Sequence, residues 1–274
     1  MIGDVAMGEV YVGGQGAPLV LLHGVGGSWQ VWKPVLSLLE RQFRVIVPTL
    51  PGHRGGEPLP AGVEPTIGLI ADRLLLQLRA MGIEQAHVAG NSLGGWLAVE
   101  LARRGFALSV TALSPAGGWR SQQDYRALVR SLMVPFRLMP LLFLLFWLLM
   151  GIAAVRRALS ANTMEHGDRI PTHDFRSSLV AFMRCRMMPR LFHNTEASGA
   201  IAPYDATRLP VCVAWSALDR VLPFDTYGRP FLDRVSGAQH CVIEAAGHVP
   251  MYDQPEAVAQ RIAATATRQT KEAT

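Results

Sequence analysis

The stretch Gly90-Asn91-Ser92-Leu93-Gly94 places a serine between two glycines, directly after the apolar run Ala86-His87-Val88-Ala89. The run has the length and composition of a buried strand, and the residues from Leu93 to Arg104 have those of a helix. A serine on so sharp a strand-to-helix turn is held in strained backbone geometry, which costs roughly 1–3 kcal/mol and is retained where it exposes a reactive atom. The flanking glycines leave room for neighbouring backbone to approach. The pattern therefore predicts a nucleophilic serine at position 92.

Three other apolar runs of strand type are each followed by a group that could take part in catalysis. One run leads into the glycine-rich loop His23-Gly24-Val25-Gly26-Gly27, a second leads into Asp219, and a third leads into His248. Because parallel strands present their carboxyl ends at one edge of a sheet, we expect these groups to meet Ser92 there. The sequence predicts a catalytic triad in the order Ser92, Asp219, His248.

These motifs resemble those of the α/β-hydrolase superfamily, in its lid-bearing branch of esterases, lipases and C–C-bond hydrolases. The resemblance extends over most of the chain, from about Gly16 to Arg268. It rests on His23-Gly24-Val25-Gly26-Gly27, Pro51-Gly52-His53-Arg54-Gly55, the turn around Ser92, Asp219-Arg220-Val221-Leu222-Pro223 and Gly247-His248-Val249-Pro250.

The fold expected from this resemblance is α/β, and the alternation of apolar runs and helical segments independently indicates a mostly parallel, doubly wound sheet. The first strand or hairpin is expected around Val5 to Val12. We expect eight strands, with a helical lid inserted after the sixth. The core would comprise residues 1–117 and 204–274, and the lid residues 118–203.

The resemblance also implies a role for each site residue. Ser92 would attack the substrate, His248 would accept its proton, and Asp219 would orient the other imidazole nitrogen. The backbone N–H groups of Val25 and Leu93 would bind the developing oxyanion.

Two histidines in the motifs are assigned no catalytic role. His23 is expected to order its own loop by hydrogen bonding. His53 lies on a proline- and glycine-rich loop and is expected to be exposed or to line the entrance to the site.

Departures from the family pattern separate the candidate reactions. Epoxide hydrolases and haloalkane dehalogenases carry an aspartate at the position of Ser92, which argues against both. Hydrolases that cleave C–C bonds of ring-fission products usually follow the catalytic histidine with tryptophan, whereas Val249 stands here. A serine esterase is therefore favoured. A C–C-bond hydrolase, and a hydrolase-fold protein that binds ligands without turnover, remain the alternatives.

The expected lid is helical, rich in methionine and basic. Between Gly118 and Tyr204 there are eleven arginines against five acidic residues, and Leu138 to Val155 is a run of eighteen residues without a charge. This length reaches the lower bound for a membrane span. A span would place strands of one sheet on opposite sides of a bilayer, so the fold excludes it. The run is expected either to cover an acyl pocket or to lie in a membrane interface, where its arginines would meet anionic headgroups.

Apolar and flexible methionine side chains suit irregular hydrophobic ligands, so the expected substrate is an ester with a medium or long acyl group, or a lipid. Peripheral membrane contact through the lid is the expected macromolecular interaction, and the arginines lack the interleaved aromatics of a nucleic-acid site. Residues expected to line the substrate pocket from the lid are Trp119, Met139, Phe143, Phe146, Trp147 and Met150.

Composition is consistent with one globular enzyme. A chain of 274 residues with 50% hydrophobic content can bury a large core. Its three cysteines suggest no disulfide framework, and no cysteine or histidine pair has metal-ligand spacing, so neither metal nor cofactor is expected. The residues from Met1 to Asp4 lack the pattern of a secretory signal. These features predict a cytoplasmic protein, peripheral at the membrane if the lid docks there.

Overall fold

A computed structural model describes residues 7–268, and its centre is a seven-stranded sheet. The edge strand β1 pairs antiparallel with β3, and all other neighbours in this sheet are parallel. In spatial order the strands are β1 (Val10–Gly13), β3 (Phe43–Pro48), β2 (Ala17–Leu22), β4 (Ala86–Asn91), β5 (Ala107–Leu113), β7 (Val211–Ser216) and β9 (Gln239–Ile243). A separate two-stranded sheet joins β6 (Tyr204–Asp205) to β8 (Val235–Ser236).

The prediction of eight strands was wrong for the described residues, where the main sheet has seven. The expected first strand or hairpin is a single strand that begins only at Val10, because β1 pairs with the distant β3 rather than with its neighbour in sequence. Val5 and Ala6 lie outside the described residues. With one strand fewer before it, the helical segment follows the fifth strand of the chain and not the sixth.

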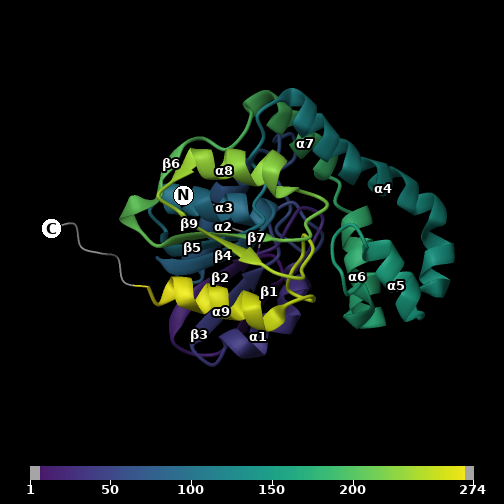
Figure 1. Ribbon diagram of the computed structural model, residues 1–274, viewed down its shortest axis with the longest axis horizontal. Coiled ribbons are helices and arrows are strands. Elements are labelled where there is room, and N and C mark those ends of the chain that lie inside the picture. The colour runs from purple at the N-terminus through teal and green to yellow at the C-terminus, as the bar shows by residue number, and fades with distance from the viewer. Residues whose placement is uncertain (1–6, 269–274) are drawn as a thin grey trace.

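Helices cover both faces of the sheet, as the doubly wound prediction requires (Figure 1). Side chains alternate along β2, so that Val20 and Leu22 enter one hydrophobic core while Leu19 and Leu21 enter the other. The first core includes α2 (Ile67–Ala80), α3 (Leu93–Arg103) and α8 (Arg229–Arg234), and the second includes α1 (Lys33–Leu39) and α9 (Pro255–Ala266). Short helical turns are η1 (Trp29–Trp32), η2 (Gly167–Arg169), η3 (Ala206–Arg208) and η4 (Phe224–Gly228).

Residues 118–203, which we call the insertion, separate β5 from β6 and contain only helices as regular structure. The helices are α4 (Gln122–Leu149), α5 (Ala153–Ser160), α6 (Thr172–Met183) and α7 (Met188–Ser198). Helix α4 starts at a capping box, in which Ser121 and Asp124 satisfy each other's backbone N–H groups. Figure 1 shows α4 running away from the sheet, with α5 and α6 beneath its distal end.

The uncharged run predicted from the sequence is not one helix. It forms the end of α4 and the start of α5, and the chain turns between them at Met150 and Gly151.

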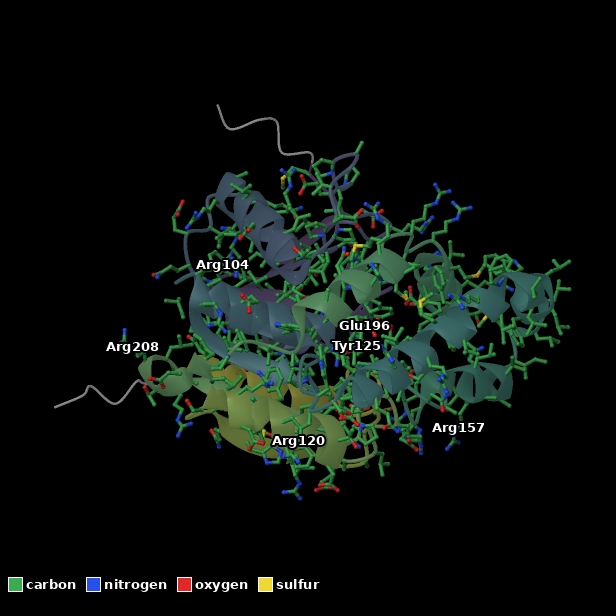
Figure 2. All side chains as sticks on the ribbon, turned by 90° about the horizontal axis from the view of Figure 1, so that it is seen from above. Arg104, Arg120, Tyr125, Arg157, Glu196 and Arg208 are labelled. Atoms are coloured by element: carbon green, nitrogen blue, oxygen red, sulfur yellow. The ribbon has the colours of Figure 1, made fainter. Side chains whose placement is uncertain are left out.

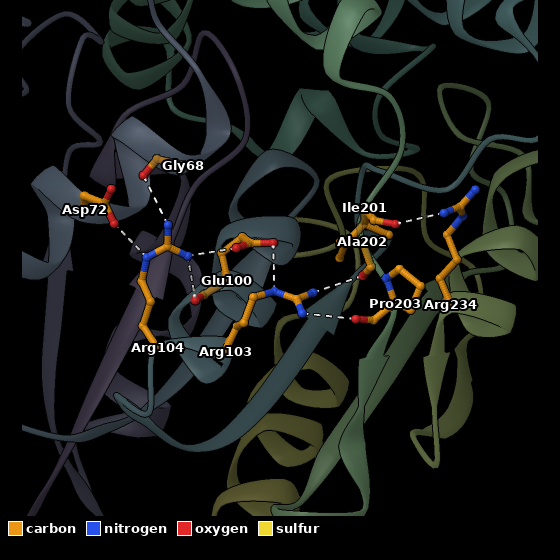
Figure 3. Close-up of polar contacts among 9 residues, drawn as sticks. All are labelled: Gly68, Asp72, Glu100, Arg103, Arg104, Ile201, Ala202, Pro203 and Arg234. Carbon is orange, nitrogen blue, oxygen red and sulfur yellow. Dashed lines mark hydrogen bonds and ion pairs between the residues drawn. The ribbon is translucent and has the colours of Figure 1, made fainter.

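The insertion returns to the core through a set of arginine contacts (Figure 3). The Arg103 guanidinium at the end of α3 donates to the carbonyl oxygens of Ala202 and Pro203, each at 3.0 Å. Arg234 donates to the carbonyl of Ile201 at 3.1 Å. These contacts hold the chain where it re-enters the sheet, ahead of the strand that leads to Asp219.

Candidate active site

Ser92 lies on the turn between β4 and α3, with φ +57° and ψ −117°. A positive φ is strained for a residue with a side chain, so surrounding structure must impose it. Two contacts show how it does so: a Cβ at Gly90 would overlap the backbone of Gly94, and a Cβ at Gly94 would overlap the carbonyl of Leu22. The glycines two residues before and after Ser92 are therefore required by close backbone approach. The Ser92 amide also donates to the carbonyl of Leu113 at 3.0 Å.

His248 and Asp219 come together at the same edge of the sheet. The imidazole Nδ1 lies 2.7 Å from Asp219 Oδ2, and both side chains are buried. Asp219 Oδ1 accepts the amide N–H groups of Val221 at 2.9 Å and Leu222 at 2.7 Å. Because the carboxylate is an acceptor, Nδ1 carries the proton and Nε2 is left to accept one.

Ser92 and His248 line the same cavity. Within the described chain, the Ser92 hydroxyl forms no hydrogen bond with His248. Contacts of this kind often tighten only when substrate is bound. The geometry therefore places the Ser92 residue and an imidazole with a free acceptor nitrogen on one cavity, and the Asp219 carboxylate holds the other nitrogen of that imidazole.

Val25 and Leu93 carry the two backbone amides predicted to bind an oxyanion. Both residues line the cavity, and neither amide donates to a backbone acceptor elsewhere in residues 7–268. The Leu93 amide is the first of α3, where N–H groups have no partner within the helix. Two unused donors next to Ser92 have the character of an anion-binding pair.

His23 orders the loop that carries Val25. Its Nε2 accepts the Leu50 amide at 2.9 Å, so the proton is on Nδ1, which donates to the Gly24 carbonyl at 2.7 Å. Burial, and secondarily the neighbouring His53, hold the pKa of His23 well below its usual value. A neutral ring is the form that can both donate and accept in this way.

His53 is not exposed, because its side chain is buried, and it is not among the residues that line the Ser92 cavity. The ring packs edge-on against His23 with centroids 4.9 Å apart, and burial lowers the pKa of His53 to about 4.

Sequence reasoning missed two side chains that hold the His248 loop. Asn91 Nδ2 donates to the carbonyls of His248 at 2.8 Å and Leu113 at 3.1 Å. Asn91 lies inside the serine motif, so the sequence placed it near Ser92 but did not indicate its bond to the His248 carbonyl. It ties the loop of the histidine directly to the turn of the serine.

Asp253 is the second missed residue, and no sequence pattern pointed to it. Its buried carboxylate accepts the backbone N–H groups of Gly247, Glu165 and His166 at 2.8–3.0 Å. The Val249 amide beside it donates to the carbonyl of Thr163 at 2.8 Å. The insertion is thus joined by hydrogen bonds to the loop that carries His248.

The cavity around Ser92 has a volume of about 190 Å³, and its walls are almost entirely apolar. The core contributes one side and helices α4, α6 and α7 contribute the other. The lining from the insertion consists of Trp119, Tyr125, Leu128, Leu132, Thr163, Phe182, Leu191, Phe192 and Thr195. Within residues 7–268, no group of three or more His, Cys, Asp or Glu side chains is arranged to hold a metal ion.

Of the six pocket residues predicted from the insertion, only Trp119 lines this cavity. The other five lie on or just beyond the distal half of α4. Met139, Phe143, Phe146 and Met150 pack in a separate cluster with Phe175 and Leu179, and the Trp147 ring lies 5.3 Å from that of Phe143 at an angle of 40°. The reason is length, because 28 helical residues extend about 40 Å and carry the end of α4 past the cavity.

Comparison with known proteins agrees with this fold. Residues 19–261 match the model of the alpha/beta hydrolase family, and the chain belongs to that family. It is 28% identical over 256 residues to the pimeloyl-[acyl-carrier protein] methyl ester esterase of Aeromonas hydrophila, covering 89% of this chain and 92% of that protein. It is 27% identical over 196 residues to the epoxide hydrolase EphH of Mycobacterium tuberculosis, covering 71% of this chain and 92% of that protein.

Solved structures share the architecture at lower identity. A thermophilic esterase from Thermogutta terrifontis aligns with a TM-score of 0.69 at 20% identity, covering 93% of this chain and 91% of that one. The 2-hydroxy-6-oxo-6-phenylhexa-2,4-dienoate hydrolase of Rhodococcus sp. strain RHA1 aligns with a TM-score of 0.71 at 22% identity, covering 94% of each chain. At this level of identity the similarity defines the fold, and the reaction has to be argued from the site.

Proposed function

We propose that this protein is a serine hydrolase that cleaves carboxylic esters with medium or long apolar acyl groups. One observation carries the proposal: Ser92 and an Asp219-bound His248 open onto a single cavity whose remaining walls are almost entirely apolar. Ser92 supplies the hydroxyl nucleophile of an acyl transfer, and this distinguishes the site from an epoxide hydrolase that attacks through an aspartate.

The reaction would proceed through an acyl-enzyme. Ser92 Oγ adds to the ester carbonyl while His248 Nε2 accepts its proton, and Asp219 stabilises the resulting imidazolium. The carbonyl oxygen becomes an oxyanion next to the unused amides of Val25 and Leu93, where each donor contributes about 3–4 kcal/mol of barrier lowering. His248 then protonates the departing alcohol. Water, activated by the same histidine, attacks the acyl-enzyme and releases the carboxylic acid.

The cavity supports an apolar acyl group over a charged or sugar substrate. Within its lining, polar side chains are few, and two of them have partners elsewhere: the Tyr125 hydroxyl donates to the Phe192 carbonyl at 2.6 Å, and the Asn91 amide donates to backbone. An ionised or polyhydroxylated group would lose water on entry without regaining hydrogen bonds. Each buried methylene of an acyl chain contributes roughly 0.8 kcal/mol, so kcat/KM should rise with chain length until the cavity is full.

The test is hydrolysis of a series of p-nitrophenyl esters from acetate to palmitate, with wild type beside Ser92→Ala. We expect kcat/KM to peak at eight carbons or longer and to be lost in the variant. A covalent fluorophosphonate probe should label wild type and leave the variant unlabelled.

Two results would contradict the proposal. One is ester cleavage by Ser92→Ala at the wild-type rate. The other is absence of ester cleavage together with loss of the absorbance of a vinylogous diketo acid, which would identify a C–C-bond hydrolase.

A further inference from the structure

The distal half of α4 presents a continuous apolar surface that the rest of the described chain leaves open. Leu141, Leu144 and Leu148 are 81, 71 and 69% exposed, values expected of polar surface residues. Further exposed apolar side chains on and beside this stretch are Val134, Leu138, Leu142, Leu145, Leu149 and Ile152. We call these nine residues the outer surface of α4. So large a contiguous apolar patch on a soluble protein indicates an interaction site.

The exposure does not come from a loosely packed helix, because the opposite side of α4 is occupied. Phe143 and Phe146 pack toward Phe175 on α6. The Arg176 guanidinium lies 4.7 Å from the ring of Trp147 and donates to its backbone carbonyl at 2.8 Å. The inner side is therefore fixed against α6, whereas the side chains of the outer surface are exposed. Figure 1 shows α4 at the edge of the molecule, with α5 and α6 on one side of its distal end.

The surroundings of this surface are strongly basic. Residues 125–164 contain five arginines and neither acidic residues nor lysine. Of these, Arg130, Arg137 and Arg157 are exposed, and no carboxylate in residues 7–268 forms an ion pair with them. Figure 2 shows Arg157 among the helices at the far end of the insertion. An apolar surface bordered by cations matches a layer of acyl chains beneath anionic headgroups.

From this geometry we infer that the outer surface of α4 docks the protein onto an anionic lipid bilayer, with the helix lying in the interface. The helix is long and apolar enough to cross a membrane by length and composition. It does not span one here, since its first turns line the Ser92 cavity and the chain enters and leaves the insertion through neighbouring strands β5 and β7.

A second copy of the chain is the competing occupant of this surface. In a symmetric dimer the arginine borders of the two copies would face each other, which costs energy in the absence of intervening acids. The bilayer is the occupant whose charge complements the surface. This inference concerns binding and goes beyond the proposed ester hydrolysis, so each can fail without the other.

The test is co-flotation of the full-length protein with vesicles of phosphatidylcholine and phosphatidylglycerol in equal parts, and with phosphatidylcholine alone. We expect wild type to float with the anionic vesicles. The variant Leu141→Gln/Leu144→Gln/Leu148→Gln should lower the partition coefficient roughly tenfold or more. The control variant, Leu76→Gln/Leu108→Gln, changes exposed leucines outside the insertion. It should leave the partition coefficient unchanged.

Charge is tested separately. Neutralising Arg130 and Arg137 to glutamine should weaken binding to anionic vesicles by roughly fivefold for each arginine at low salt. The control Arg208→Gln changes an exposed arginine at the end of the molecule opposite the insertion (Figure 2).

Binding by Ser92→Ala should equal that of wild type, which separates docking from turnover. Equal flotation of wild type and the triple leucine variant would overturn the inference. A wild-type dimer that the triple variant dissociates, with no flotation of either protein, would overturn it in favour of self-association.

Discussion

Both halves of α4 carry apolar side chains, and the second half is the more apolar, but their surroundings are opposite. In the first half, Tyr125 and Leu128 are buried and line the Ser92 cavity, together with Leu132. In the second half, Leu141 and Leu144 are the most exposed large hydrophobic side chains of the described residues. The difference shows that neighbouring elements decide whether the apolar side chains of a helix line a cavity or remain exposed. Helix α7 and Trp119 pack against the first half, whereas α6 packs against one side of the second.

The largest effect on the reaction rate should come from the core side of the cavity, which carries the residues of the candidate triad. Asp219→Asn should lower kcat for a medium-chain ester by about 10⁴-fold, because an amide presents the wrong hydrogen-bonding partner to His248 Nδ1. Stopped-flow measurement of p-nitrophenol release provides the value. Retention of more than a tenth of the wild-type rate would remove Asp219 from the proposed triad.

A pair of matched tryptophan variants would show directly whether each half of α4 contributes to the substrate site. Leu128→Trp adds volume inside the cavity, so kcat/KM for an octanoyl ester should fall roughly tenfold to a hundredfold while that for an acetyl ester changes little. Leu144→Trp, placed on the outer surface, should leave both values unchanged. If Leu144→Trp altered the chain-length preference, the distal half of α4 would belong to the substrate site after all.

A smaller effect on kcat is expected from Asp253, which joins the insertion to the loop that carries His248. Asp253→Asn replaces a carboxylate that accepts three backbone N–H groups with an amide that has one acceptor oxygen, so the free energy of unfolding should fall by about 1.5–3 kcal/mol. Displacement of His248 should also lower kcat roughly tenfold, with KM little affected.

The control for this variant is Asp225→Asn, which removes an exposed carboxylate paired with Arg229 and should change neither quantity measurably. Urea unfolding and steady-state kinetics test both variants. An unchanged kcat in Asp253→Asn would show that the link to the insertion does not position the histidine.

The smallest effect on stability should come from the outer surface of α4. Leu144→Gln should change the free energy of unfolding by less than about 0.5 kcal/mol, since the side chain gains little burial on folding. Leu128→Ala should cost about 2–4 kcal/mol, because it removes a buried side chain from the cavity wall. Chemical denaturation of both variants in the same buffer checks the contrast. Equal losses would mean that the outer surface is buried in solution.

Local sequence rules were sufficient for the fold class and for placing Asp219 and His248 at the sheet edge that carries Ser92. Glycine spacing marked the strained turn, and apolar strands followed by polar groups placed Asp219 and His248 at one sheet edge. These inferences succeed because backbone strain and strand direction are properties of short segments. The number of strands was missed because β1 pairs with β3, a contact between segments far apart in the chain.

Tertiary structure alone decided what each part of the insertion does. Composition identified an apolar, arginine-rich helical segment, but five of its six predicted pocket residues pack elsewhere. Side-chain periodicity describes which residues share a side of a helix and carries no information on what will cover that side. The same holds for Asp253, whose partners Glu165 and His166 are distant in sequence. The sequence by itself determined the family fold and the residues of the candidate triad, because local backbone geometry dictates them. The cavity walls, the link from the insertion to His248 and the open surface of α4 were decided by packing between segments far apart in the chain.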